Sequence, residues 1–135
     1  MQQLDCIILV DDDEVTNYVH ESVIEDAGVT KDVLVAEDGR KALTLLEGLK
    51  AQATGCPNLI FLDINMPVMN GFEFLDAYQQ IKGDIKHPVI IVMLTSSLNT
   101  SDVARARAAG ATDFLDKPLT PEKLNKVLNE HFDGE

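Results

Sequence analysis

Short apolar runs alternate with amphipathic segments along almost the whole chain. Each run has four to six residues, which suits a buried strand; the runs occupy positions 6–10, 33–36, 59–62, 89–94 and 112–115. Between the runs, apolar side chains recur every three or four residues, which is the spacing of one helix face. Helices are therefore expected at about 15–27, 42–49, 72–81 and 101–109, and from Pro121 to about Phe132. This alternation predicts an α/β fold with a parallel sheet covered by helices on both faces.

Two of the expected helices should differ in how strongly their apolar side chains pack against the sheet. The first has an apolar face that ends at Gly28; the face comprises Val15, Val19, Val23 and Ala27, with Tyr18 and Ser22. We expect this face to be the one that packs. In the helix at 101–109 the apolar residues are nearly all alanine, so this helix should be weakly anchored.

The composition is that of a single acidic globular domain. A chain of 135 residues suits one domain with a sizeable core, and we expect residues 1–135 to form it. The formal charge of −12 disfavours nucleic acid and anionic membranes as partners, and favours cations or basic protein surfaces. No apolar run approaches the roughly 18 residues of a membrane span. The start, "MQQLDC", lacks the features of a signal peptide, so a cytoplasmic location is expected.

The two cysteines are too few for a disulfide framework. Cys6 opens an apolar run, and we expect it to be a buried thiol. The three histidines, at positions 20, 87 and 131, lie in different segments and form no metal-binding set in the sequence. Each is expected at the surface or at its boundary.

Four of the five expected strands are followed directly by polar side chains that are candidates for a common site. They are Asp11 and Asp12 after the first, Asp63 after the third, Thr95 and Ser96 after the fourth, and Asp116 and Lys117 after the last. In parallel α/β sheets, ligands bind at the carboxyl ends of the strands, where the strand order reverses. If the first and third strands are neighbours, three carboxylates, a hydroxyl and an ammonium should converge on one small pocket.

This set of groups suits phosphoryl transfer. Carboxylate oxygens with room for water are typical ligands of Mg²⁺. Asp63, central on a strand tip, could act as a nucleophile and form an aspartyl-phosphate. Lys117 could neutralise one phosphoryl oxygen and Thr95 could donate a hydrogen bond to another. The neighbouring Asp13 and Glu14 are better explained as first-turn acids that cap a helix and complement its dipole.

Four motifs in a fixed order, "LVDDD", "LDINMPVMNG", "LTSS" and "DKP", resemble those of the receiver domain of two-component response regulators. The resemblance is to the chemotaxis-type, single-domain kind and covers nearly the whole chain. It implies a doubly wound, flavodoxin-like (βα)5 sandwich with strand order 2-1-3-4-5. It also implies a candidate cis peptide between Lys117 and Pro118.

The resemblance assigns a role to each matching residue. Asp63 would be the phosphoacceptor, and Lys117 and Thr95 would contact the phosphoryl group. Ser96 would line the site, and Phe114 takes the position of a switch aromatic residue. Mg²⁺ would be bound by Asp11, Asp12, Asp63 and the backbone carbonyl of Asn65.

The function implied is that of a phosphorylation-activated signalling switch. A histidine kinase or phosphotransfer protein would supply the phosphoryl group, and an unknown protein target would recognise the changed surface. A terminal switch and a phosphorelay intermediate are both compatible with the sequence. The reactions at Asp63 would be self-catalysed phosphorylation and dephosphorylation, and no other enzyme activity is expected.

Two further hypotheses fit the motifs less well. A haloacid-dehalogenase-like phosphatase would need a second aspartate two residues after its nucleophile, where this chain has Asn65. A degenerate receiver that acts only as a binding module would usually have lost Asp63, one of the acid pair or Lys117, and all are present.

Overall fold

The computed structural model describes residues 3–50, 55–85, 87–96 and 99–132. These residues form a five-stranded parallel sheet in the order β2-β1-β3-β4-β5, which confirms the predicted fold class and strand order. The strands are β1 (Leu4–Val10), β2 (Thr30–Ala36), β3 (Leu59–Leu62), β4 (Ile90–Thr95) and β5 (Asp113–Asp116). The helices are α1 (Glu14–Ala27), α2 (Gly39–Leu49), α3 (Gly71–Ile81), α4 (Thr100–Ala108) and α5 (Pro121–His131), with a 3₁₀ turn, η1 (Lys82–Asp84).

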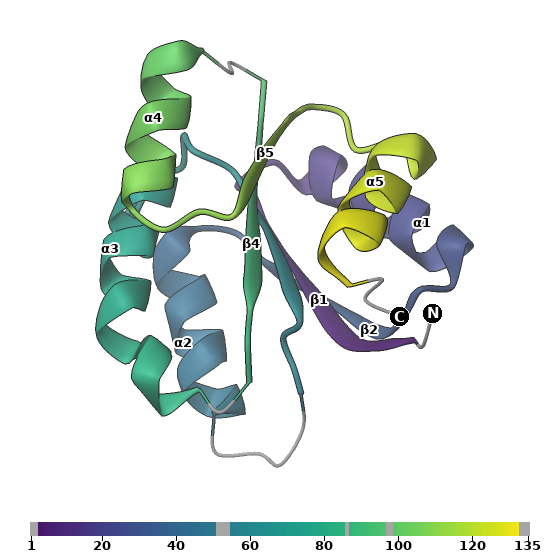
Figure 1. Ribbon diagram of the computed structural model, residues 1–135, viewed down its shortest axis with the longest axis horizontal. Helices are drawn as coiled ribbons and strands as arrows, with labels where there is room; N and C mark the ends of the chain where they lie inside the picture. The colour runs from purple at the N-terminus through teal and green to yellow at the C-terminus, as the bar shows by residue number, and fades with distance from the viewer. Residues whose placement is uncertain (1–2, 51–54, 86, 97–98, 133–135) are drawn as a thin grey trace.

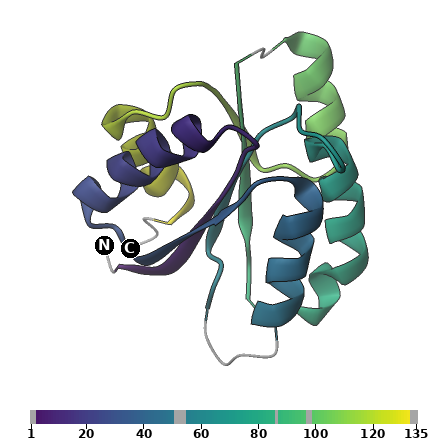
Figure 2. The same ribbon diagram turned by 180° about the vertical axis from the view of Figure 1, so that it is seen from behind.

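The sheet lies between two helical layers. Helices α2, α3 and α4 cover one face, and α1 and α5 cover the other (Figures 1 and 2). Alternate side chains of a strand point to opposite faces, so Ile8 and Ile60 enter the core under α2 and α3, while Leu9 and Phe61 enter the core under α1 and α5. Among the described residues, no helix combines the length and apolar character needed to cross a bilayer.

Each main helix begins at a residue whose side chain caps it. The capping side chains accept a hydrogen bond from a backbone N–H of the first turn; they belong to Asp13, Asp38, Asn70, Asn99 and Thr120. The cap at Asp13 confirms the role expected for that residue. The caps of α1 and α2 fix the helix starts within four residues of the strand tips, so these two connections are short, whereas α3 begins nine residues after the end of β3.

The prediction for the buried face of α1 was wrong. The side chains of α1 that are buried are those of Asn17, His20 and Ile24, whereas Val15 and Tyr18 are about 70% exposed (69% and 71%). The reason is hydrogen bonding: Asn17 donates to the carbonyl of Asp11, and the buried imidazole of His20 accepts a backbone N–H of a distant segment. These two polar side chains face inward because they form hydrogen bonds with backbone groups that packing has removed from water.

Cys6 is buried as expected, but it is not a free thiol, because it forms a disulfide with Cys56. Backbone pairing explains why residues 50 positions apart meet. The side-chain oxygen of Asn58 accepts the N–H groups of Asp5 and Cys6, at 2.7 and 3.2 Å, and the N–H of Asn58 donates to the carbonyl of Cys6 at 3.0 Å. The segment before β3 is thereby held against the start of β1.

Candidate functional site

The tips of β1 and β3 place two carboxylates next to each other. Val10 and Leu62 are register partners at the ends of these central strands. The N–H of Asp63 donates to the carbonyl of Val10 at 2.9 Å, so the pairing continues one residue past the strand. Asp11 and Asp63 therefore emerge side by side at the carboxyl edge, where the sheet order reverses between β1 and β3.

The predicted convergence of three carboxylates is confirmed. One oxygen from each of Asp11, Asp12 and Asp63 lies within 4.8 Å of the others. Asp11 and Asp63 are buried, with exposed fractions of 5% and 7%, whereas Asp12 is exposed. Two oxygens of the cluster are already held by backbone groups: the N–H of Asp13 donates to Asp11 and the N–H of Ile64 donates to Oδ1 of Asp63, each at 2.9 Å.

Lys117 supplies the positive charge within this cluster. Its Nζ lies 2.5 Å from Oδ2 of Asp11 and 3.6 Å from Oδ1 of Asp63. Burial alone would lower the pKa of Lys117, but the hydrogen bond to Asp11 and the charge of Asp63 raise it above its usual value. The lysine is therefore a fixed cation between the two buried carboxylates.

Asp63 has an unusually high pKa for an aspartate. Burial and the neighbouring charge of Asp11 raise it to about 6, although Lys117 and the N–H of Ile64 act in the opposite direction. The residue is still mostly ionised at neutral pH. A buried carboxylate that is incompletely compensated attracts further positive charge, and oxygen donors of this kind suit Mg²⁺. The described donors therefore fit the predicted cation.

The other predicted site residues lie at the same edge or behind it. Thr95 ends β4 and is buried, Ser96 follows it and is exposed, and Asn65 is exposed two residues after Asp63. Phe114 lies farther back on β5, half-buried against the core under α3 and α4. Its ring carries the guanidinium of Arg107 at 4.8 Å from the centroid. The roles assigned to these residues by resemblance stay predictions.

The loop that carries Lys117 is held at several points. The N–H of Lys117 donates to the carbonyl of Thr95 at 2.9 Å, and the peptide to Pro118 is cis, as the resemblance implied. The ammonium of Lys123, on α5, donates to the carbonyls of Asp116 and Pro118 at 2.7 and 3.1 Å. Lys123 was not among the predicted site residues, and only its position seven residues after Asp116 could have suggested this role.

The loop after Asp63 depends on a glycine. A Cβ at Gly71 would lie 2.5 Å from the carbonyl oxygen of Asp63, so no larger residue fits without moving the backbone. The N–H of Gly71 also donates to the carbonyl of Ile64 at 2.8 Å. Gly71 therefore sets how closely α3 approaches the strand tip that carries Asp63.

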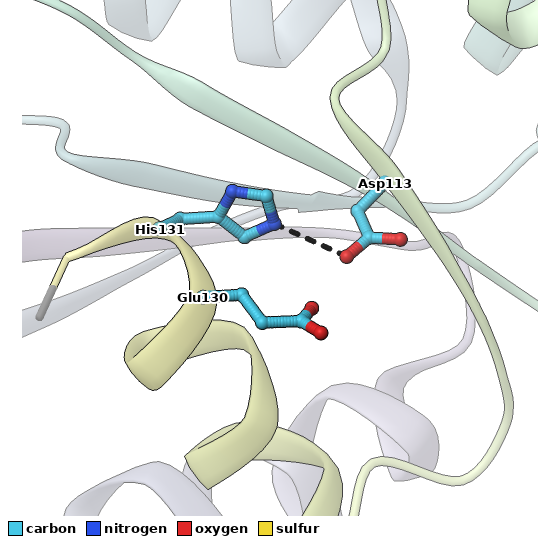
Figure 3. A group of neighbouring side chains, drawn as sticks. All are labelled: Asp113, Glu130 and His131. Atoms are coloured by element: carbon cyan, nitrogen blue, oxygen red, sulfur yellow. Dashed lines mark hydrogen bonds and ion pairs between the residues drawn. The ribbon is translucent and has the colours of Figure 1, made fainter.

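A second group of ionisable side chains lies toward the opposite end of β5. It consists of Asp113, at the start of the strand, and Glu130 and His131, at the end of α5 (Figure 3). Nε2 of His131 lies 3.1 Å from Oδ2 of Asp113, which attaches the last turn of α5 to the sheet. His131 and His87 lie at the boundary of the protein as predicted, whereas the prediction for His20 was wrong because that side chain is buried.

Comparison with known proteins identifies the family. The family model described as "Response regulator receiver domain" matches residues 7–129. The chain belongs to this family. An uncharacterised 14.6 kDa protein of Leptolyngbya boryana is 31% identical to this receiver over 131 residues, which are 97% of this chain and 92% of that protein. The DNA-binding response regulator MtrA of Mycobacterium tuberculosis is 35% identical over 118 residues, which are 87% of this chain but only 46% of MtrA.

Solved structures give the same result. A two-component response regulator from Cytophaga hutchinsonii superposes with a TM-score of 0.87 at 32% identity, covering 96% of this receiver and 97% of that chain. The chemotaxis response regulator CheY4 of Vibrio cholerae gives 0.76 at 33% identity, covering 95% and 98%. The receiver domain of yeast Ssk1, solved in complex with the phosphotransfer protein Ypd1, shares the fold at 23% identity and a TM-score of 0.79, covering 96% of this chain and 90% of that chain.

Several relatives are much longer than this receiver. It spans 28% of a protein-glutamate methylesterase of Methanococcus maripaludis and 3% of the hybrid signal transduction histidine kinase G of Dictyostelium discoideum, at 30% identity to each over 83% and 93% of this chain. The shared part is therefore a signalling domain that occurs in proteins with different activities. Such a domain is a phosphorylation-activated switch of two-component signalling.

Proposed function

We propose that Asp63 is the residue of this receiver that accepts the phosphoryl group, from a histidine kinase or a phosphotransfer protein. The observation that supports this assignment is the position of Asp63 between two further carboxylates and the ammonium of Lys117. Asp11 is equally buried at the same edge, but both of its oxygens are already held, one by Lys117 and the other by the N–H of Asp13. The function would then be exerted through contacts with a protein target.

The geometry suggests which oxygen reacts. Oδ1 of Asp63 already accepts the N–H of Ile64 and faces Lys117 at 3.6 Å, so Oδ2 is the oxygen from which a bond to phosphorus would form. As that bond forms, the bond between phosphorus and the donor's nitrogen breaks, and the electron pair leaves with the donor's imidazole. Lys117 would then neutralise part of the charge on the transferred group.

The acid cluster would also hold Mg²⁺. Asp11, Asp12 and Asp63 would supply carboxylate oxygens, and Asn65 its backbone carbonyl. The cation would neutralise charge on the phosphoryl oxygens during transfer. In its absence, Lys117 is the group that keeps the two buried carboxylates together.

The switch would act through Thr95 and Phe114. Thr95 would turn towards the phosphoryl group, and the ring of Phe114 would fill the space that this movement leaves. Helix α4 is a suitable element to respond, because the only buried side chain on it is that of Ala106, a small residue. The helix is also held by two cation–π contacts, of Arg105 with the ring of Phe72 and of Arg107 with the ring of Phe114.

The donor protein would approach over α1. This helix starts four residues after the end of β1, beside the acid cluster, and its exposed large side chains are those of Val15, Tyr18 and Val19. Apolar groups that border a reactive site are typical of a protein-docking surface. A donor that covers them would bring its phosphohistidine to Asp63. Whether the receiver is a terminal switch or passes its phosphoryl group onward depends on partners outside this chain.

The proposal can be tested by intact-protein mass spectrometry after incubation with Mg²⁺ and acetyl phosphate. We expect one phosphoryl adduct on the wild type, and none on Asp63→Asn or in EDTA. Asp116→Asn is the matched control, because Asp116 lies at the same edge but pairs with Lys123 at 3.2 Å. An adduct that persists in Asp63→Asn, or that is lost in Asp116→Asn, would contradict the assignment. Labelling by a histidine kinase instead of acetyl phosphate would test the class of donor.

A further inference from the structure

A buried histidine links helix α1 to the loop that carries Lys117. His20 is 3% exposed, and its Nε2 accepts the backbone N–H of Leu119 at 3.2 Å. The two residues are 99 positions apart in the sequence, so this contact joins opposite ends of the chain. Leu119 is itself buried at 2% exposure, and a buried N–H without a partner would cost as much as a lost hydrogen bond.

The contact between His20 and Leu119 restrains the loop at a second point, two residues after its attachment to β4. Lys117 donates its own N–H to Thr95 on one side, and Leu119, two residues later, is held by His20 on the other. The lysine side chain starts between these two anchors and has to reach Asp11 and Asp63 together. Loss of one anchor would let the backbone of the loop shift, and Nζ would shift with it.

The imidazole acts here as an acceptor, which requires its neutral form with the proton on Nδ1. Burial, and then the positive charge of Lys117, lower the pKa of His20 and favour that form. An aliphatic side chain of similar size could fill the same space under α1. Only a side chain with an acceptor near the position of Nε2 could also hold Leu119.

We propose that His20 is a positioning residue for the phosphorylation reaction, which sets the reach of Lys117 through the N–H of Leu119. This inference deepens the proposed function and rests on it. It differs from a role in packing alone, because it depends on one acceptor atom. It also differs from a role in cation binding, because the proposed ligands of the cation are on other residues.

Two substitutions of His20 test the role of its acceptor atom separately from the role of its side-chain volume. His20→Gln keeps a carbonyl oxygen near the position of Nε2, whereas His20→Met has similar length without a comparable acceptor. His87→Met is the matched control, since Nε2 of His87 also contacts a backbone group, the carbonyl of Pro57 at 2.9 Å, but near the opposite edge of the sheet. All variants would first be compared by urea denaturation, so that rates are measured only where each protein is folded.

The first measurement is the rate of phosphorylation by acetyl phosphate at saturating Mg²⁺, beside the Mg²⁺ affinity from calorimetry. A displacement of about 1 Å in a reacting group can cost up to about a hundredfold in rate. We expect His20→Met to react about tenfold more slowly with Mg²⁺ affinity unchanged within about twofold, and His20→Gln and His87→Met to react like the wild type. An unchanged rate in His20→Met, a failure of His20→Gln to restore it, or a parallel loss of Mg²⁺ affinity would each overturn the proposal.

The second measurement is amide hydrogen exchange at Leu119, which needs no phosphodonor. The N–H of Leu119 should exchange at least about tenfold faster in His20→Met than in the wild type, and His20→Gln should restore its protection. Equal protection in all proteins would overturn the anchor itself. If the wild type forms no adduct while exchange at Leu119 responds as expected, the proposed function fails and the structural link stands, so the two failures are distinguishable.

Discussion

Replacing Asp63 by asparagine should stabilise this receiver at neutral pH when no divalent cation is present. Burial and the charge of Asp11 raise the pKa of Asp63 from 3.8 to about 6. A carboxyl group with a higher pKa in the folded than in the unfolded chain favours unfolding once it ionises. The difference between 3.8 and about 6, at about 1.4 kcal/mol for each pH unit, amounts to about 3 kcal/mol at pH 7.5.

The substitution changes little besides the charge. The side-chain oxygen of asparagine can still accept the N–H of Ile64, which now donates to Oδ1 of Asp63 at 2.9 Å. Lys117 keeps its closer partner, Asp11. The gain should therefore approach the electrostatic figure, which already includes the attraction between Lys117 and Asp63.

The pH dependence identifies the cause. Below pH 3.8 the carboxyl group is protonated in both states, so Asp63 carries no electrostatic penalty there. As the pH rises from about 4 to about 6, the unfolded chain loses the proton first, and the stability of the wild type should fall relative to that of Asp63→Asn. Above about pH 6 both states are ionised and the difference should stay constant.

The assay is urea denaturation of both proteins from pH 4.0 to 7.5 in EDTA. A variant that is less stable than the wild type at pH 7.5, or a difference that is the same at every pH, would refute the electrostatic account. Mg²⁺ supplies a second test, because a ligand at a concentration of 100 times its Kd stabilises by about 2.7 kcal/mol. It should stabilise the wild type more than Asp63→Asn.

Three further predictions concern other parts of the receiver. Reduction of the disulfide between Cys6 and Cys56 opens a loop of 50 residues and should lower the free energy of unfolding by about 4 kcal/mol, from the chain entropy that the loop regains. Urea denaturation with and without reductant would measure this loss, and an unchanged midpoint would contradict it. Asn70→Ala removes the cap and capping box of α3 and should cost about 1 kcal/mol in the same assay, and no loss would mean that the cap is dispensable. Tyr18→Ser should leave phosphorylation by acetyl phosphate unchanged but slow phosphorylation by a histidine-containing donor protein, and equal effects on both donors would exclude a docking role for this exposed side chain.

The sequence was informative where local pattern and strand polarity decide the structure. Asp11, Asp63 and Lys117 follow apolar runs directly, and parallel strands bring such positions to one edge, so their meeting could be predicted. The inward face of α1 could not, because its valines and its polar residues offer two competing faces of similar spacing. Which face is buried depends on the backbone N–H of Leu119, a partner 99 residues from His20.

The disulfide escaped prediction for a related reason. Cys6 is an ordinary apolar-run residue in the sequence, and Cys56 lies outside any element. Their approach depends on the hydrogen bonds of Asn58 to the start of β1. Such tertiary pairings leave no periodic signal, whereas strand ends do.

The stacking of Arg107 on Phe114 has a consequence for what a partner could sense. The guanidinium lies 4.8 Å from the centre of a ring that belongs to another element, so a rotation of that ring takes away the surface on which the charge rests. The protein carries 23 acidic and 11 basic residues, so one relocated arginine is a considerable change in local potential. The signal that leaves this receiver could therefore be carried by the position of a positive charge as much as by the shape of α4.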